Sequence, residues 1–495
     1  MCGIAGINGN NISEKLYNML ISMKHRGPDG SGVFVDNSVI FGDLDKLDVP
    51  EGSFGLGHNL LSIVGCQGSQ PLTHDKLVLV CNGEIYNYNK LKKGFEDDFK
   101  SDSDSEIVLM LIKQFYKDSI YEAVLKTVEY LDGDYAFAVY DGKDFAAVRD
   151  PLGVKTLYFG ENKDQNIFAF ASERKALWNI GINDVQTLSP TSMIYNKKII
   201  KFNNKISEII TTNSDNSVNH YLSKDELKKQ LKTNLIASVK KRVKGLSEVG
   251  ILFSGGIDST IIAKIVLDLG IKTTLYSVGH EKAIDLKFSK ETALKLNLPI
   301  KIKTVDIKDV KNYLNPVLYA IEEFNLMKIG VGMPAYIAAE MAHEDGLKVM
   351  LSGQGADELF GGYNRYLRIY NEKGTIKNED LWDDILNLYH VNLQRDDAVT
   401  MANSIELRVP YLDLDIINTA MNIPMKYKIN GKDDNLRKCI LREVGTELGV
   451  HAEIVKRPKK AAQYGSGIHK MLKKILKEDQ FKNLPDKFNK HYIVN

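Results

Sequence analysis

Cysteine is scarce in this chain, and features typical of several protein classes are missing. The 495 residues include four cysteines, at positions 2, 66, 81 and 439, and no CxxC pair. A zinc site or a disulfide framework is therefore not supported. No apolar run is long enough to span a membrane, and the N-terminal sequence MCGIAGING lacks the basic and apolar regions of a signal peptide. We therefore expect a cytoplasmic protein with no membrane partner.

An excess of charge of either sign is also absent. The chain has 65 Lys and Arg against 64 Asp and Glu, a formal net charge of +1. Such a balance gives no strong field to attract nucleic acid or an anionic membrane, so we expect small-molecule partners and no nucleic acid. The composition, 43% hydrophobic and 26% charged, is that of a globular protein, and the length predicts two or three domains.

The most informative stretch is VGILFSGGIDST at residues 249–260. Its first five residues are apolar apart from one glycine, as in a short buried strand, and apolar residues at helical spacing follow the stretch. The glycines between them let the backbone approach a phosphate, and the N–H groups of the first helical turn point at it. The alternative is a plain strand-to-helix turn. The predicted phosphate-binding residues are Ser254, Gly255, Gly256, Asp258 and Ser259.

This loop lacks the Gly-Lys-Ser/Thr ending of a Walker A motif. Its SGGIDS sequence instead resembles the loop of the ATP pyrophosphatases. That resemblance implies that the loop holds the pyrophosphate part of ATP while the substrate attacks the α-phosphorus, which gives an adenylate.

Cys2 directly follows the initiator methionine, and Gly3 follows it. Removal of Met1 would leave a residue with both a thiol and a free α-amine. The amine can take the thiol proton, directly or through water, and the thiolate can attack a carbonyl. The alternative is a chance cysteine at position 2.

Further motifs favour the catalytic interpretation, and together they resemble the N-terminal-nucleophile glutaminase domain of class II amidotransferases over residues 2–200. This resemblance implies a sandwich of antiparallel sheets with flanking helices. The apolar segments 77–81, 136–140 and 167–171 are expected to form strands of this sandwich. The motifs, in order, are MCGIAGI, HRGPDGSG, GHNLLSIVG, QPL, NGEIYNY, SDSE, LDGDYAFAVYD, RDPLGVKTLYFG and FASERKAL.

The same resemblance assigns roles within the glutaminase domain. Cys2 is the nucleophile, and Asn82 and Gly83 form the oxyanion hole that a tetrahedral intermediate needs. The glutamine-binding residues are Glu84 and Asp104, which take the α-ammonium, together with Ile63. The alternative for the Asn-Gly pair is a hairpin turn.

Leu60 departs from this family pattern. The family usually has an arginine two positions after the histidine at 58, where it binds the α-carboxylate of glutamine. Leucine has no donor for that carboxylate. Either another group replaces the arginine, with Arg26 as a candidate, or glutamine binds poorly.

The C-terminal half alternates predicted strands and helices, which indicates a doubly wound parallel sheet. Strands are expected at 274–278, 300–305 and 348–351, and ligands in such sheets bind beyond the carboxyl ends of the strands. A second glycine-rich stretch, SGQGADELFGGY at 352–363, follows the last of these. Its Asp357, with Asp258, is suited to hold Mg²⁺ on phosphates.

With MANSIELRVPYLD and KRPKKAAQYGSG added, this half resembles the synthetase domain of the glutamine-dependent asparagine synthetases. The resemblance implies ATP and Mg²⁺ as cofactors, and a homodimer is compatible with it. Lys459 would contact the pyrophosphate, unless residues 456–460 are only a solvated basic run. The further ATP-binding residues implied are Leu252, Val278, Ser352 and Gly353.

Gln354 is the second departure, since members of this family often have glutamate there. An amide donates and accepts hydrogen bonds but takes no proton at neutral pH. This position leaves the identity of the acceptor carboxylate open.

We therefore predict a glutaminase domain at 1–205, a surface linker at 206–223 and a synthetase domain at 224–495. The predicted reaction is ATP-dependent conversion of aspartate to asparagine through a β-aspartyl adenylate, with glutamine or ammonia as nitrogen donor. Four alternatives remain: a mainly ammonia-dependent asparagine synthetase, a related amidotransferase or amide ligase with another carboxylate acceptor, an RNA-modifying ATP pyrophosphatase, and a non-catalytic paralogue. The near-zero net charge argues against the RNA-modifying enzyme.

Overall fold

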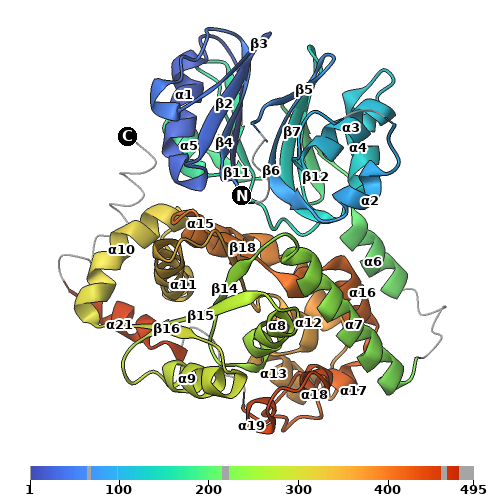
Figure 1. The fold of residues 1–495 in the computed structure, drawn as a ribbon, viewed down its shortest axis with the longest axis vertical. Helices are drawn as coiled ribbons and strands as arrows, with labels where there is room; N and C mark the ends of the chain where they lie inside the picture. Colours follow the sequence, from blue (N-terminus) through green and yellow to red (C-terminus); the bar gives the residue numbers. More distant parts are fainter. Residues whose placement is uncertain (1, 64–68, 97–98, 215–221, 459–464, 479–495) are drawn as a thin grey trace. The chain divides into compact units, whose positions relative to one another are not determined.

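The computed structural model describes residues 2–63, 69–96, 99–214, 222–458 and 465–478. The chain divides into two compact units (Figure 1). Among the described residues, the first comprises 2–205 with 401–404, and the second comprises 206–400 with 405–478.

The N-terminal unit contains two sheets whose strand pairs are all antiparallel. The first sheet comprises β11 (Val185–Thr187), β9 (Tyr158–Asn162), β10 (Ile167–Ala171), β1 (Gly3–Asn8), β4 (Phe54–Leu60), β2 (Gly30–Val35) and β3 (Ser38–Gly42), in that spatial order. The second comprises β13 (Lys198–Lys201), β12 (Ser192–Tyr195), β8 (Phe145–Arg149), β7 (Gly133–Tyr140), β6 (Leu77–Ile85) and β5 (Leu72–His74). The predicted antiparallel sandwich is confirmed.

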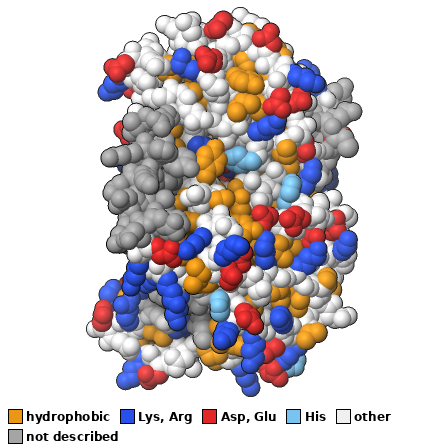
Figure 2. Space-filling model, turned by 90° about the vertical axis from the view of Figure 1, so that its left-hand side faces the viewer, with side chains coloured by type: hydrophobic (Ala, Val, Ile, Leu, Met, Phe, Trp, Pro, Cys, Tyr) orange, Lys and Arg blue, Asp and Glu red, His pale blue; other side chains and the backbone are white. Residues whose placement is uncertain are grey.

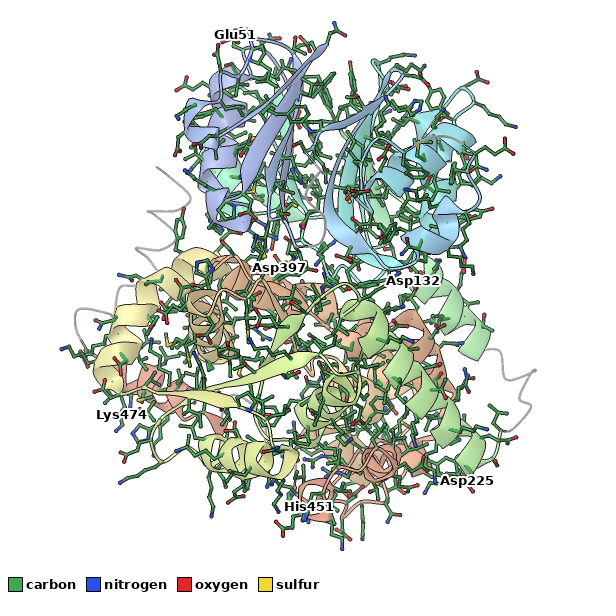
Figure 3. All side chains as sticks on the ribbon, viewed as in Figure 1. Glu51, Asp132, Asp225, Asp397, His451 and Lys474 are labelled. Atoms are coloured by element: carbon green, nitrogen blue, oxygen red, sulfur yellow. The ribbon has the colours of Figure 1, made fainter. Side chains whose placement is uncertain are left out.

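Strand periodicity explains the layers of this unit. Successive residues of a strand point to opposite faces of the sheet. In β6, Val78 and Val80 join the core between the sheets, whereas Leu77 and Leu79 join the core beneath the helices. Figure 3 shows side chains in the space between the two sheets. The helices and 3-10 turns are α1 (Ser13–Ser22), η1 (Lys24–Arg26), η2 (Leu44–Lys46), α2 (Tyr88–Lys92), α3 (Glu106–Phe115), α4 (Ile120–Tyr130) and α5 (Arg174–Trp178).

The C-terminal unit is built on a five-stranded, fully parallel sheet. The spatial order is β16 (Ile300–Thr304), β15 (Lys272–Gly279), β14 (Glu248–Leu252), β17 (Val349–Leu351) and β18 (Glu406–Arg408). The chain moves outward to one side of β14 with β15 and β16, then crosses to the other side with β17. This reversal opens a crevice beyond the carboxyl ends of β14 and β17, where ligands bind in such sheets. The predicted doubly wound sheet is confirmed.

Helices pack around this sheet. The region predicted as a linker contains helix α6. The helices are α6 (Lys205–Ser214), α7 (Lys224–Arg242), α8 (Ile257–Asp268), α9 (Ile284–Leu296), α10 (Ile307–Ile321), α11 (Leu326–Glu344), α12 (Ala356–Phe360), α13 (Asn364–Lys373), α14 (Glu379–Leu386), η3 (Tyr389–Leu393), α15 (Gln394–Met401), η4 (Pro410–Leu412), α16 (Leu414–Asn422), α17 (Met425–Lys428), α18 (Cys439–Glu447), α19 (Ala452–Val455) and α21 (Ile468–Ile475).

The surface agrees with the balanced composition. On the face shown in Figure 2, acidic and basic side chains are mixed rather than separated by sign. Among the described helices, none combines the length and the apolar character needed to cross a bilayer.

Candidate active sites

Cys2 is held at the start of the central strand β1 by a residue of the other sheet. Its backbone N–H donates to Asn82 Oδ1 at 2.9 Å, and the cysteine is only 7% exposed. Asn82 Nδ2 is also buried and has no hydrogen-bond partner among the described residues. A buried donor without a partner is costly, so this N–H group is available to a ligand oxygen beside the thiol.

Asn82 and Gly83 lie within strand β6, where they pair with Ala136 and Tyr135 of β7. The hairpin-turn alternative is therefore wrong. A side chain at Gly83 would come within 2.7 Å of the Asp134 carbonyl oxygen, so the strand has no room for one. Glycine here lets the two strands approach closely beside the nucleophile.

Arg26 is fully buried and contacts the nucleophile residue itself. Its Nε donates to the Cys2 carbonyl oxygen at 3.2 Å, and Nη1 donates to Glu173 Oε1 at 3.0 Å. Burial acts to raise the pKa of Glu173, but His25, Lys175 and Arg26 outweigh it and hold that pKa well below its usual range. Arg26 is thus committed to an internal ion cluster and to the Cys2 backbone, which disfavours it as the substitute for the arginine missing at 60.

A cavity of about 280 Å³ lies beside Leu60. Of the described residues that line it, which include His58 and Leu60, none is a lysine or arginine. Burial lowers the pKa of His58 to about 3, so this imidazole is neutral at pH 7 and gives no positive charge for a carboxylate. Among the other predicted glutamine-binding residues, Asp104 accepts the Ile85 N–H, while Glu84 and Ile63 are half-buried.

The predicted phosphate loop connects β14 to α8 as expected. Gly255 adopts φ +68°, and a side chain there would come within 2.5 Å of the Phe288 backbone, so glycine is required on both counts. Arg457 Nη1 donates to the Gly255 carbonyl at 2.8 Å and anchors the loop from outside. The first turn of α8 follows this loop directly, which is the arrangement in which backbone N–H groups bind phosphate.

The crevice contains a cavity of about 190 Å³. Gly255 and Gly256 shape the loop but do not line this cavity. Lys459 lies outside the described residues. The predicted ATP or metal residues that do line it are Leu252, Ser254, Asp258, Ser259, Val278, Ser352, Gly353 and Asp357.

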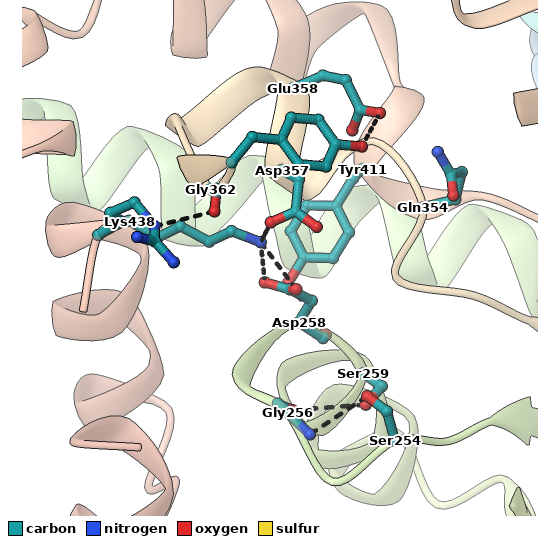
Figure 4. A network of polar contacts seen from close by, with 12 residues as sticks. Ser254, Gly256, Asp258, Ser259, Gln354, Asp357, Glu358, Gly362, Tyr411 and Lys438 are labelled. Atoms are coloured by element: carbon teal, nitrogen blue, oxygen red, sulfur yellow. Dashed lines mark hydrogen bonds and ion pairs between the residues drawn. The ribbon is translucent and has the colours of Figure 1, made fainter. Parts of the chain in front are cut away.

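Lys438 joins the two predicted metal ligands (Figure 4). Its Nζ lies 2.8 Å from both carboxylate oxygens of Asp258 and 2.6 Å from Asp357 Oδ1. The lysine is fully buried. Sequence reasoning missed it because it lies in the helix-like run NLRKCILRE, which carries no glycine-rich or acidic signal.

The positions of Asp258 and Asp357 are relevant to Mg²⁺ binding. Two carboxylates converge on a single positive centre, and Mg²⁺ is typically bound by one or two protein carboxylates with phosphate oxygens completing the shell. Among the described residues, no group of three or more His, Cys, Asp or Glu side chains could hold a metal without such help. Asp258 and Asp357 therefore fit a cation that arrives with a nucleotide, rather than one caged by protein alone.

Glu358 also lines this cavity, and sequence reasoning did not select it. Burial and the neighbouring Asp357 raise its pKa to about 7, although a hydrogen bond from the Tyr363 hydroxyl at 2.7 Å opposes the rise. Gln354 lines the same cavity from the loop before α12. Arg395 and Asp396 complete the polar lining and likewise carried no recognisable signal in the sequence.

Comparisons with known proteins agree with this two-site arrangement. Residues 1–213 match the glutamine amidotransferase domain family, and residues 230–380 and 371–493 match the asparagine synthase family. A Methanocaldococcus jannaschii protein named "Putative asparagine synthetase (glutamine-hydrolyzing) 1" is 42% identical, over 97% of this chain and 96% of its own length. The glutamine-hydrolyzing asparagine synthetase 1 of Saccharomyces cerevisiae is 28% identical, over 90% of this chain and 80% of its own.

Proposed function

Because the chain belongs to the asparagine synthase family, we propose that it makes asparagine from aspartate with glutamine or ammonia as nitrogen donor. Aspartate is activated by ATP as a β-aspartyl adenylate, and pyrophosphate leaves. Ammonia then displaces AMP to give the amide. We assign glutamine hydrolysis to a domain at 1–205 and synthesis to a domain at 224–495, in the cytoplasm.

In the glutaminase domain, Cys2 acts as the nucleophile once Met1 has been removed. Its α-amine accepts the thiol proton, and the thiolate attacks the side-chain amide of glutamine. Asn82 Nδ2 and the Gly83 N–H donate to the oxyanion that develops. Arg26 holds the Cys2 carbonyl, which fixes the direction of the thiol. Glu84, Asp104 and Ile63 bind the glutamine.

In the synthetase domain, the N–H groups of the 254–259 loop bind the pyrophosphate part of ATP, and Leu252 and Val278 meet the adenine. Mg²⁺ held by Asp258 and Asp357 would neutralise charge on the phosphates. Lys438, already between these carboxylates, gives a second positive charge near the leaving pyrophosphate. Lys459 approaches the same phosphates. Ser352 and Gly353 close the site from the end of β17.

The observation that best supports this proposal is the buried Asn82 Nδ2 beside Cys2, which has no hydrogen-bond partner among the described residues, in a chain that also carries the phosphate loop. The test is asparagine formation from aspartate and MgATP with either glutamine or ammonia. Asparagine from both donors is the expected result. Failure with both, while pyrophosphate is released with another carboxylate, would contradict aspartate as the acceptor.

Gln354 favours a second candidate function. An amide in place of the usual glutamate removes a negative charge from the acceptor cavity, which suits a different carboxylate acceptor. We rank it below aspartate, because the remaining synthetase motifs follow the asparagine pattern. A screen of pyrophosphate release over amino acids and common carboxylates, with ammonia supplied, separates the two. A homodimer is our proposal for the assembly, and sedimentation tests it.

A further inference from the structure

One wall of the synthetase cavity carries buried charges that the adenylation chemistry does not use. Glu358, Arg395 and Asp396 are 2%, 6% and 7% exposed, and all three line the cavity. They come from helices α12 and α15. Burying ions costs free energy unless partners compensate for it, so three buried charged side chains in one cavity need an explanation.

These charges form one connected network. Asn392 Nδ2 donates to Glu358 Oε1 at 2.9 Å, the same oxygen that accepts from the Tyr363 hydroxyl. Arg395 Nη1 donates to Asn392 Oδ1 at 3.2 Å. Asn392 therefore bridges the carboxylate and the guanidinium and fixes their spacing. It lies in η3, a π-helical turn, which is a rare feature that often occurs at functional sites.

The guanidinium retains capacity for a ligand. Its Nε and Nη2 both contact Asp396 Oδ1, at 2.8 and 2.7 Å, and Nη1 contacts Asn392. These three contacts account for three of the five N–H groups that an arginine carries. The planar group is suited to a carboxylate, whereas the Glu358 carboxylate is suited to an ammonium.

An α-amino acid presents a carboxylate and an ammonium on the same carbon, which matches this pair of opposite charges. We propose that Arg395 binds the α-carboxylate and Glu358 the α-ammonium of the acceptor amino acid. The acceptor's side-chain carboxyl then extends toward the phosphate loop, whose Ser254, Asp258 and Ser259 line the same cavity. This subsite rests on the proposed function and explains how the enzyme selects an amino acid over a simple carboxylate.

The test compares three acceptors, with pyrophosphate release measured under saturating MgATP and ammonia. Aspartate carries both α-groups, 3-aminopropanoate lacks the α-carboxylate, and succinate lacks the α-ammonium. Arg395→Gln should raise the KM for aspartate about 10- to 100-fold, the loss of one charge-assisted contact, and leave the KM for 3-aminopropanoate unchanged. Glu358→Gln should raise the KM for aspartate and leave that for succinate unchanged.

Two further variants sharpen the result. Arg395→Lys keeps the positive charge but lacks the planar guanidinium group. It should therefore show a smaller rise in the aspartate KM than Arg395→Gln. Arg368→Gln, at an exposed arginine of α13, is the matched control and should behave as the wild type. The KM for ATP should stay the same in all of them.

Each outcome of these measurements supports or contradicts the subsite. An equal rise for aspartate and 3-aminopropanoate in Arg395→Gln would mean a structural role and overturn the subsite, as would an unchanged aspartate KM. A wild-type enzyme that releases no pyrophosphate with aspartate contradicts both the subsite and the proposed function. A wild type that prefers aspartate, with variants that lose all three acceptors alike, contradicts the subsite alone.

Discussion

Lys438 Nζ lies 2.8 Å from both carboxylate oxygens of Asp258, although 180 residues separate the two in the chain. The same ammonium lies 2.6 Å from Asp357, so one buried cation joins the phosphate loop to the loop after β17. Without a cation between them, two neighbouring carboxylates would repel each other. Lys438 therefore keeps the crevice assembled before a nucleotide arrives.

Asp258→Asn and Asp357→Asn should each stop pyrophosphate release with either nitrogen donor. Each change removes a negative charge from the site proposed for the metal and its phosphates, which weakens transition-state stabilisation by roughly several kcal/mol. Glutamine hydrolysis to glutamate, measured in the same preparations, should persist. Normal pyrophosphate release in both variants would contradict their role as metal ligands.

Cys2→Ala should abolish glutamine-dependent asparagine formation and leave the ammonia-dependent reaction intact. The thiol is the proposed nucleophile, whereas the synthetase chemistry uses no residue of the first sheet. Asparagine is measured with each donor in turn. As a matched control, Cys439→Ala removes a thiol from α18 and should retain glutamine use. Normal glutamine use by Cys2→Ala would exclude the assignment.

The missing arginine at 60 should give a high KM for glutamine, and Leu60→Arg should lower it. One charge-assisted contact to the α-carboxylate is typically worth about 1.5–3 kcal/mol, or roughly 10- to 100-fold in affinity. The cavity beside Leu60 has room for a longer side chain, and neutral His58 does not repel it. The KM for ammonia should not change. A wild-type KM for glutamine that is already low would show that another group binds the carboxylate.

Lys428 should make the stability of the C-terminal unit rise with pH. This lysine is fully buried and donates to Asn378 Oδ1 at 2.9 Å, and burial lowers its pKa to about 7. The unfolded chain, with a pKa near 10.4, binds more protons between these two values, so the free energy of unfolding increases from about pH 7 to pH 10.

Lys428→Met should flatten that slope, since the variant has no proton to lose. Denaturant unfolding of both proteins at pH 7, 8 and 9 provides the measurement. The difference in slope is the informative quantity, because Met also removes the hydrogen bond to Asn378 at every pH. Parallel pH profiles would show that Lys428 is charged in the folded protein.

The sequence predicted the layers well and the charged network poorly. The strand predicted at 167–171 coincides with β10, because periodicity reflects burial. β18 was not predicted, since two of its three residues are charged, whereas the equally short β17 is entirely apolar. Lys438 and Arg395 were also missed, because lysine and arginine side chains usually lie on the solvated surface. Only the tertiary fold brings Lys438 to Asp258 and Asp357, and Arg395 to the cavity.

The hydrogen bond between Cys2 and Asn82 joins the start of β1, the central strand of one sheet, to β6, which lies next to the edge strand of the other sheet. The glutaminase centre therefore exists only while the sheets keep their mutual alignment, and sliding one past the other by a fraction of a residue would separate nucleophile from oxyanion donor. Such sliding leaves every strand intact. On heating, glutaminase activity should consequently be lost at a lower temperature than the far-UV circular dichroism signal of the strands. Loss of this activity would then report that the two sheets have shifted relative to each other before they unfold.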